Sequence, residues 1–265
     1  MAARAHTATH KRDKMVTRGT GVVCCLCAAF AQVAAVPKNP AKWDYVSGGD
    51  AGPEVWGEIG EPDYPECKGR EQSPINIVTG GAARSEEGGD QGGEVVAAVD
   101  TMLTDSVVSL DGGVGAVVSI DTEAASGLDG TTGSFYRWDG SLTTPPCAEH
   151  VKWFLSKRVV KISEDALHSY TNHVESQPGH GIAPSLNNRP VQPLYSRTVT
   201  EGFASDIAQT FAASTARFEV EQFFHAPRYT CSSGDCGSVT VEGEIYKLIQ
   251  IHFHARAENT INGAT

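Results

Sequence analysis

Alternation of apolar and polar side chains is clearest near the carboxy terminus, over residues 246–254. The run Tyr-Lys-Leu-Ile-Gln-Ile-His-Phe-His is rich in β-branched and aromatic residues, which favours a strand with side chains on alternate faces. His252 and His254 therefore share one face with Gln250. The opposite face, which we expect to pack in an apolar layer, carries Ile249, Ile251 and Phe253.

Further strands are expected in the middle of the chain. Residues 151–162 form a β-type stretch, and the valine-rich runs 95–99 and 107–120 suit short strands broken by a Gly-Gly turn. Residues 37–78 are rich in Trp, Tyr, Pro and Gly, which predicts an irregular lead-in held by its aromatic side chains.

Two helices are expected. Ser163 is suited to cap a short helix over residues 166–173, with Glu164 and Asp165 in the first turn. Phenylalanine and isoleucine recur every fourth residue between 200 and 213, which predicts an amphipathic connector helix there.

The composition is that of a loop-rich globular protein with a single domain. The 265 residues are 40% hydrophobic and 20% charged, and they include 28 Gly. With 21 Lys and Arg against 32 Asp and Glu, the net charge is −11, which disfavours a nucleic-acid partner.

The amino terminus reads as a signal peptide over residues 1–36, in which basic residues precede a short apolar run that ends in small residues. An amino-terminal membrane anchor is the alternative, but the run is short and no later stretch is long enough to span a membrane. We therefore expect a secreted or lumenal domain over 37–265. Within it, residues 79–133 are acidic, rich in Gly and of doubtful order.

Seven cysteines are present, and three of them lie in the expected signal peptide. The other four allow three pairings in an oxidising compartment. The short spacing of Cys231 and Cys236 suits a local bridge across a turn, which leaves Cys67 to pair with Cys147. The alternative is that some of the four remain buried free thiols.

The two histidines at 252 and 254 are candidate metal ligands. Two imidazoles two residues apart on a strand can chelate one Zn²⁺ at about 2.0–2.1 Å each. The same pattern also suits two histidines satisfied by ordinary hydrogen bonds at the rim of a pocket. The pattern by itself leaves both interpretations open.

Four motifs together point to a known family. The lead-in ends in Gln72-Ser73-Pro74-Ile75, and a loop further on reads Ser141-Leu142-Thr143-Thr144-Pro145-Pro146. Later motifs are Asn188-Arg189-Pro190-Val191-Gln192-Pro193-Leu194 and Gln250-Ile251-His252-Phe253-His254, with Glu258 and Asn259 after it. These motifs resemble the α-class carbonic anhydrases. The resemblance implies a mostly β fold, with a twisted, largely antiparallel sheet and short peripheral helices.

The resemblance also implies a site and a reaction. His252 and His254 match two of three zinc ligands, Thr143 matches the hydroxyl that aims the nucleophile, and Glu258 matches the carboxylate that orients Thr143. The implied activity is zinc-dependent, reversible hydration of CO₂ to bicarbonate and a proton. The residues that match the substrate pocket and its surroundings are Leu142, Thr144, Trp153 and Gln250. The resemblance also supports the bridge between Cys67 and Cys147.

The chain departs from the family pattern in three ways. The two-histidine strand follows the Thr-Thr-Pro-Pro loop, whereas in the family it precedes that loop. No strand with a third zinc histidine is found; residues 94–100, the nearest in composition, have none. The usual proton-shuttle position falls on Ala216. His150 and His225 are candidate substitute ligands, although each is expected to be a surface histidine.

The rearranged order has two explanations. Either the chain joins pieces of two incomplete domains, or its carboxy-terminal strand inserts into a sheet formed by earlier segments, since strand pairing does not depend on chain order. A site with only two protein ligands is expected to retain zinc weakly or not at all. The competing function is therefore a carbonic anhydrase-related binding module without turnover, or an incomplete gene product.

Overall fold

The computed structural model describes residues 43–59, 64–80, 116–119, 134–157, 163–176, 187–203, 208–210, 216–223 and 226–264. The expected signal peptide over 1–36 and most of the acidic segment over 79–133 lie outside these residues, and both stay predictions. No helix among the described residues has the length and apolar character to cross a membrane.

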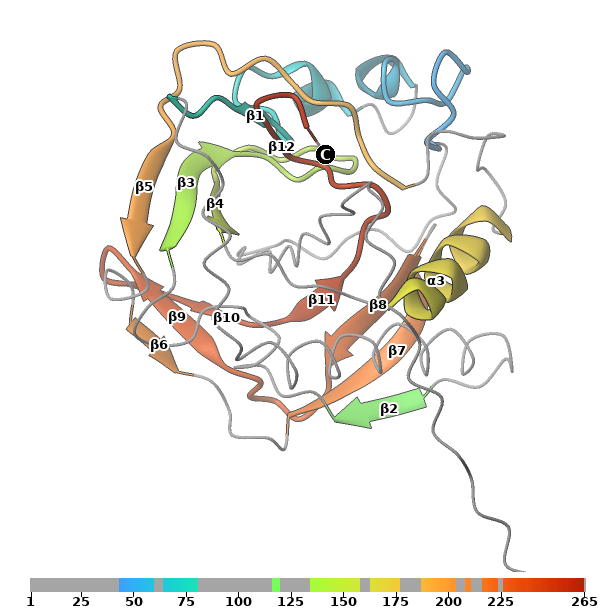
Figure 1. The fold of residues 1–265 in the computed structure, drawn as a ribbon, viewed down its shortest axis with the longest axis vertical. Coiled ribbons are helices and arrows are strands. Elements are labelled where there is room, and N and C mark those ends of the chain that lie inside the picture. The colour runs from blue at the N-terminus through green and yellow to red at the C-terminus, as the bar shows by residue number, and fades with distance from the viewer. Residues whose placement is uncertain are drawn as a thin grey trace, which may run out of the picture.

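The described chain is mostly β, as predicted (Figure 1). Its helical elements are η1 (Trp56–Glu58), η2 (Pro65–Lys68) and α3 (Glu164–Ser176). Its strands are β1 (Asn76–Ile77), β2 (Ala116–Ser119), β3 (Ser134–Gly140), β4 (Val151–Ser156), β5 (Thr200–Phe203), β6 (Ala208–Thr210), β7 (Arg217–Phe223), β8 (Ala226–Cys231), β9 (Ser238–Val241), β10 (Glu244–Lys247), β11 (Gln250–His252) and β12 (Thr260–Ile261).

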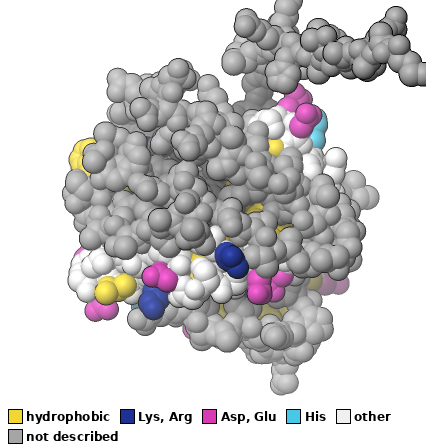
Figure 2. All heavy atoms as spheres, turned by 90° about the horizontal axis from the view of Figure 1, so that it is seen from below, with side chains coloured by type: hydrophobic (Ala, Val, Ile, Leu, Met, Phe, Trp, Pro, Cys, Tyr) yellow, Lys and Arg dark blue, Asp and Glu magenta, His cyan; other side chains and the backbone are white. Residues whose placement is uncertain are grey.

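The strands form four sheets, in the orders β11-β8-β7-β2, β10-β9-β6, β4-β3-β5 and β1-β12. Every pair of described strands is antiparallel except β1 and β12, which are parallel. The expectation of largely antiparallel pairing is therefore confirmed. Acidic and basic side chains are interspersed on the coloured part of the face in Figure 2.

Segments far apart in the sequence lie side by side. Asn76 of β1 is opposite Thr260 of β12, and Val118 of β2 is opposite Phe218 of β7. In Figure 1 the red carboxy-terminal segment accordingly runs beside the teal segment that contains β1. The later segments thus pair with earlier ones in the rearranged order.

Two buried aromatic clusters stabilise the lead-in and the pair of strands β3 and β4. Trp138 of β3 and Trp153 of β4 are cross-strand partners whose rings stack with centroids 5.6 Å apart. The predicted aromatic lead-in is confirmed, since Trp43, Tyr45 and Trp56 meet edge to face in a second buried cluster.

Both expected disulfides are present. The bond between Cys67 and Cys147 joins the lead-in to the loop after β3, and the bond between Cys231 and Cys236 closes a short turn after β8. Disulfides form and persist in oxidising compartments, so the two bonds indicate an extracellular or lumenal protein.

The helix predicted from its cap is confirmed as α3. The Ser163 hydroxyl accepts a hydrogen bond from the Ala166 N–H at 3.2 Å, as an N-cap residue does. Tyr170 on the buried side of this helix donates a hydrogen bond to the Phe253 carbonyl, and the two rings meet edge to face. The helix therefore packs against the segment that carries the two histidines.

The connector helix predicted for residues 200–213 is wrong where the structure describes it. Residues Thr200–Phe203 and Ala208–Thr210 are strands, paired with β3 and β9. A glycine inside a helix costs about 1 kcal/mol relative to alanine, whereas Gly202 here is buried opposite Phe135. The hydrogen-bonded pairing with β3 and β9 therefore decides the structure of these residues, although their apolar side chains have helical spacing.

The single strand predicted for residues 246–254 is also wrong, because it is interrupted at Leu248 and Ile249. β10 pairs with β9, whereas β11 pairs with β8, so the chain changes partner at the break. Leu248 is buried and Ile249 is 38% exposed, contrary to the expected faces. Ile251 and Phe253 are buried as expected.

Candidate functional site

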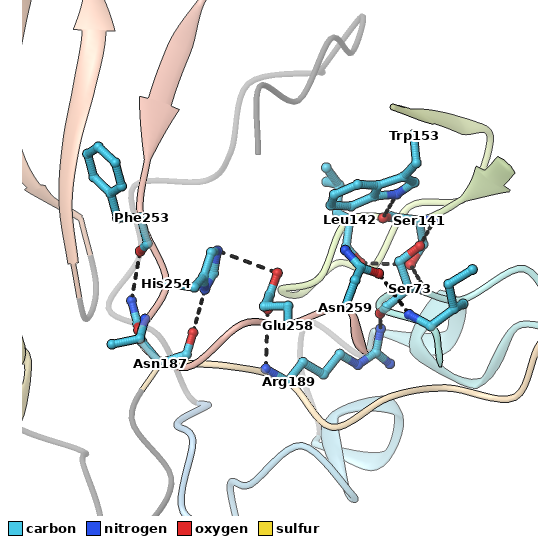
Figure 3. A network of polar contacts seen from close by, with 12 residues as sticks. Ser73, Ser141, Leu142, Trp153, Asn187, Arg189, Phe253, His254, Glu258 and Asn259 are labelled. Atoms are coloured by element: carbon cyan, nitrogen blue, oxygen red, sulfur yellow. Dashed lines mark hydrogen bonds and ion pairs between the residues drawn. The ribbon is translucent and has the colours of Figure 1, made fainter. Parts of the chain in front are cut away.

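His254 lies two residues beyond the last residue of β11 and is almost fully buried. Its Nδ1 atom bonds to the carbonyl of Asn187 (Figure 3). The Asn187 side chain donates a hydrogen bond to the Phe253 carbonyl and accepts one from the Ala255 N–H. It therefore fixes the backbone on both sides of His254. A carbonyl can only accept, so the Nδ1 atom of His254 carries a proton.

Glu258 is buried beside His254 on the loop that leads to β12. Its Oε1 atom accepts the backbone N–H of Arg189 at 3.2 Å, and its Oε2 atom lies 3.5 Å from His254 Nε2 (Figure 3). Burial raises the pKa of Glu258, although His254 and a hydrogen bond from Thr143 oppose that rise. The carboxylate thus contacts the histidine segment, the Arg189 segment and the loop after β3.

Arg189 ties the site to the amino-terminal lead-in. Its guanidinium donates to the Gln72 side chain at 2.9 Å, to the Ser73 carbonyl at 2.8 Å and to the Cys67 carbonyl at 3.3 Å. The ring of Trp56 lies 5.4 Å from this guanidinium. Burial lowers the pKa of Arg189 to about 10, and the side chain remains charged at neutral pH.

Thr143 reaches Glu258 from the loop that follows β3. Ser141 fixes the start of this loop, since its hydroxyl accepts the Ser73 N–H at 2.9 Å and its carbonyl accepts the Trp153 indole N–H at 2.9 Å. Gly140 allows this close packing, because a Cβ there would lie 2.2 Å from the Ser73 hydroxyl. Thr143 itself is buried.

His252 ends β11 and lies next to His254, with the two ring centroids 4.9 Å apart. Across the sheet it is opposite Arg228 of β8, which in turn is opposite Glu221 of β7. Burial and, to a smaller extent, the neighbouring His254 and Arg228 lower the pKa of His252 to about 3. His252 is therefore neutral at physiological pH, the form in which imidazole binds a metal.

The other four residues predicted for the site lie on β4, on β11 and in the loop after β3. Leu142 and Trp153 pack with Trp138 in a core cluster, and Thr144 accepts the Cys147 N–H at 2.8 Å within its loop. Gln250 begins β11 opposite Thr230. Pocket and supporting roles for these four residues stay predictions, whereas His252, His254, Glu258 and Thr143 are brought together.

The donor set fits a metal only in part. The buried Nε2 of His254 and Oε2 of Glu258 lie 3.5 Å apart and make no hydrogen bond within the described chain. However, the described residues include no group of three His, Cys, Asp or Glu side chains already placed to hold an ion. His150 is 92% exposed, as expected for a surface histidine, and His225 and residues 94–100 lie outside the described residues. Ala216 is buried.

Three residues of the site were missed from the sequence. Asn187 and Arg189 adjoin or belong to a motif noted in the sequence, but their partners are about 65 to 120 positions away, so local pattern gave no role for them. Arg228 has no sequence signal at all. Its position beside His252 follows only from the register of β8 and β11.

The family match and the curated relatives of this chain are carbonic anhydrases. Residues 116–203 match the family described as eukaryotic-type carbonic anhydrase. The chain is 34% identical to human mitochondrial carbonic anhydrase 5B over 92 residues, covering 34% of this chain and 29% of the human protein. It is 43% identical to a carbonic anhydrase of Neisseria gonorrhoeae over 67 residues, covering 25% of this chain and 23% of the bacterial protein.

Among solved structures, α-carbonic anhydrase from Thermovibrio ammonificans in complex with sulfanilamide aligns with a TM-score of 0.39 and 24% identity. That alignment covers 61% of this chain and 99% of the bacterial enzyme. Dioscorin complexed with ascorbate aligns with a TM-score of 0.40 and 16% identity, over 60% of this chain and 97% of dioscorin.

The matched regions are limited in extent. The chain spans less than a third of the length of the curated relatives described above. The family match includes Thr143 and Trp153, and it ends before the segment with His252, His254 and Glu258. From the family match and the curated relatives, the chain is an α-carbonic anhydrase-like protein.

Proposed function

We propose that the chain catalyses the zinc-dependent, reversible hydration of CO₂ to bicarbonate and a proton. The observation that carries this proposal is that Thr143, from the loop after β3, meets Glu258 and His254, which share one loop near the carboxy terminus, in a rearranged order. A shared ancestry alone does not require residues so far apart in sequence to meet at one buried point.

The chain's own residues are suited to orient the nucleophile. Glu258 accepts the hydrogen bond that the Thr143 hydroxyl can donate, so the hydroxyl oxygen is left to accept a hydrogen bond from the nucleophile. A nucleophile that donates a hydrogen bond to the Thr143 oxygen turns a lone pair toward the substrate carbon. The apolar side chains of Leu142 and Trp153 would adjoin a weakly polar substrate such as CO₂.

His252 and His254 would hold the zinc. The Asn187 carbonyl accepts the Nδ1–H of His254 and so turns Nε2 toward the metal position, as a carbonyl commonly does for a histidine that binds a metal. When bound, zinc supplies the nucleophile, because it lowers the pKa of water from 15.7 to about 7. With Ala216 at the shuttle position, we expect proton export to depend on buffer.

A second candidate is a carbonic anhydrase-related binding module without turnover. It is favoured by the lack, within the described residues, of a third side chain already placed to hold a metal. Under this alternative the same fold and buried network are kept, but zinc does not accelerate CO₂ hydration.

The test is stopped-flow measurement of CO₂ hydration on the full chain, stripped with a chelator and then supplied with zinc. We expect zinc to restore a rate well above that of buffer, and His252→Ala or His254→Ala to remove this zinc-dependent rate. His168→Ala is the matched control, because His168 is exposed on α3. A folded wild-type chain with no zinc-dependent rate would support the binding module.

A further inference from the structure

The hydroxyl of Tyr170 reaches the segment of the two histidines from helix α3. Tyr170 is 3% exposed. Its hydroxyl donates a hydrogen bond to the Phe253 carbonyl and accepts one from the Asn187 side-chain amide at 3.1 Å. Its ring also meets the Phe253 ring edge to face, with centroids 6.2 Å apart. The helix is therefore joined to the backbone at the residue that lies between His252 and His254.

Asn187 is the residue through which Tyr170 reaches His254. The Asn187 side chain donates to the Phe253 carbonyl at 3.1 Å and accepts the Ala255 N–H at 2.8 Å. Its backbone N–H donates to the Ala255 carbonyl at 3.1 Å, and its own carbonyl accepts the Nδ1–H of His254. Figure 3 shows Asn187 below Phe253 and His254, with dashed lines to both. One residue thus holds the backbone on both sides of His254 and the imidazole ring itself.

The Tyr170 hydroxyl completes the hydrogen bonding of Asn187. A side-chain amide carries two N–H donors, and that of Asn187 is buried, since the residue is 1% exposed. The Phe253 carbonyl accepts one hydrogen bond from the amide nitrogen, and the Tyr170 hydroxyl accepts another. Removing the hydroxyl leaves a buried donor without this acceptor, which costs free energy. The orientation of Asn187 therefore depends on Tyr170.

Packing alone does not account for a tyrosine at this position. A phenylalanine would fill the same space and keep the ring contact with Phe253. The helix is also held by Ala166 and Val174, both of which are fully buried. Burying a hydroxyl costs free energy unless the group is hydrogen-bonded, and the two bonds described above both end on residues that surround His254.

We propose that Tyr170 is a positioning residue for His254, on which it acts through Asn187. The hydroxyl fixes the Asn187 side chain, and the Asn187 carbonyl then fixes the ring of His254 through its Nδ1–H. The inference rests on the proposed function only in giving the orientation of His254 a part in catalysis. The positioning itself is a property of the metal-free chain, and the sequence motifs give Tyr170 no role.

The first test is exchange of the His254 Nδ1 proton with water, measured by NMR on the full chain with 15N-labelled histidine and with chelator present. His254→Gln assigns the signal. Tyr170→Phe keeps the ring and removes only the hydroxyl. We expect wild type to retain the Nδ1 proton and Tyr170→Phe to exchange it at least about fivefold faster, the factor that corresponds to one ordinary hydrogen bond.

Ser163→Ala is the control for a merely structural effect. It removes the N-cap of α3, so it weakens the same helix but leaves the Tyr170 hydroxyl in place. We expect the His254 proton to exchange at the wild-type rate in this variant. The proposal is wrong if Ser163→Ala speeds exchange as much as Tyr170→Phe does. An unchanged rate in Tyr170→Phe, or a wild-type His254 without a proton on Nδ1, would also overturn it.

A double-mutant cycle with Asn187→Ala tests the route, because this substitution removes the side chain and keeps the backbone carbonyl. If Tyr170 acts through Asn187, Tyr170→Phe has no further effect on the exchange rate once the Asn187 side chain is gone. Additive effects would show that Tyr170 acts on His254 in another way, and the proposal would fail.

The consequence for catalysis is measured separately. We expect Tyr170→Phe to lower the zinc-dependent rate of CO₂ hydration about 10-fold, at the lower end of the effect usual for residues that support a metal ligand. A full rate in Tyr170→Phe would overturn the catalytic part of the inference. A wild-type chain without zinc-dependent hydration would contradict the proposed function, and the NMR result would still decide whether Tyr170 positions His254.

Discussion

Asn76 of β1 lies opposite Thr260 of β12 in parallel register, and the Thr260 hydroxyl donates to the Asn76 side chain at 2.7 Å although 184 residues separate them. The neighbouring Asn259 accepts the buried Ile75 N–H at 2.9 Å. These contacts join the lead-in to the loop that carries Glu258, so the site depends on a junction between the two ends of the described chain.

Asn259→Ala tests this junction. The substitution leaves the buried Ile75 N–H without its acceptor, which costs about 1–3 kcal/mol of unfolding free energy. Urea unfolding of the full chain measures the loss. Thr79→Ala removes only an exposed hydrogen bond from Asn262 and is expected to cost less than about 0.5 kcal/mol. Equal costs would show that the junction does not contribute to stability as described.

The two disulfides are predicted to differ in their effect on stability. Removing the Cys67–Cys147 bond opens a loop with a sequence separation of 80, which costs about 4 kcal/mol in the chain-entropy account. Removing the Cys231–Cys236 bond, with a separation of 5, is expected to cost about 2 kcal/mol. Denaturant unfolding of the two double Cys→Ala variants compares these costs, and a larger loss for the local bond would contradict the prediction.

Arg189→Lys is predicted to destabilise the fold by about 3–5 kcal/mol, because a single ammonium cannot replace the guanidinium donors that reach three buried oxygen atoms. Arg70→Lys serves as the control, since Arg70 is exposed over the ring of Tyr195. Its cost is expected to stay below about 1 kcal/mol. Thermal unfolding monitored by circular dichroism decides between a buried structural arginine and a replaceable surface charge.

The pH dependence of the metal-free chain follows from His252. Its pKa is about 3 in the folded chain, against an ordinary value of 6.5, because burial disfavours the charged ring. Between these two values the unfolded state binds the proton and the folded state does not, so stability falls as the pH drops from 6.5 toward 3. Above pH 6.5 this contribution does not change.

His252→Gln removes that titration and is expected to flatten the loss of stability with acid over this range. Urea unfolding at a series of pH values, with chelator present throughout, compares the variant with wild type. An identical slope in both proteins would mean that His252 titrates normally in the folded chain.

Several local elements were predictable because they depend on nearby residues, whereas the fold class was predicted from the family resemblance. The cap of α3 at Ser163 and the local bond between Cys231 and Cys236 depend on neighbours a few positions away. The strand over residues 200–203 was not predictable, since its pairing with β3 outweighs the helical spacing of Phe203, Ile207 and Phe211. The break at Leu248 likewise depends on which strands β10 and β11 pair with.

The candidate site also combines residues that the sequence identifies with contacts that only the folded chain shows. The sequence identified His252, His254, Thr143 and Glu258 through motifs, but it gave no distance between them. The partners that fix their geometry, such as Asn187 for His254 and Arg189 for Glu258, lie 67 and 69 positions away. Such contacts arise only when the strands pair, so no local pattern reports them.

The most direct test of the account is the rate of CO₂ hydration by Thr143→Ala at saturating zinc, measured beside wild type and His254→Ala. Thr143 lies in the segment that matches the family, and His254 lies outside it, so both must contribute if the rearranged segments form one catalytic site. We predict that wild type accelerates hydration and that Thr143→Ala loses at least about 100-fold of this acceleration, as expected for an orienting group in a catalytic site. A wild-type rate no faster than buffer, or a Thr143→Ala rate equal to wild type, would contradict the account.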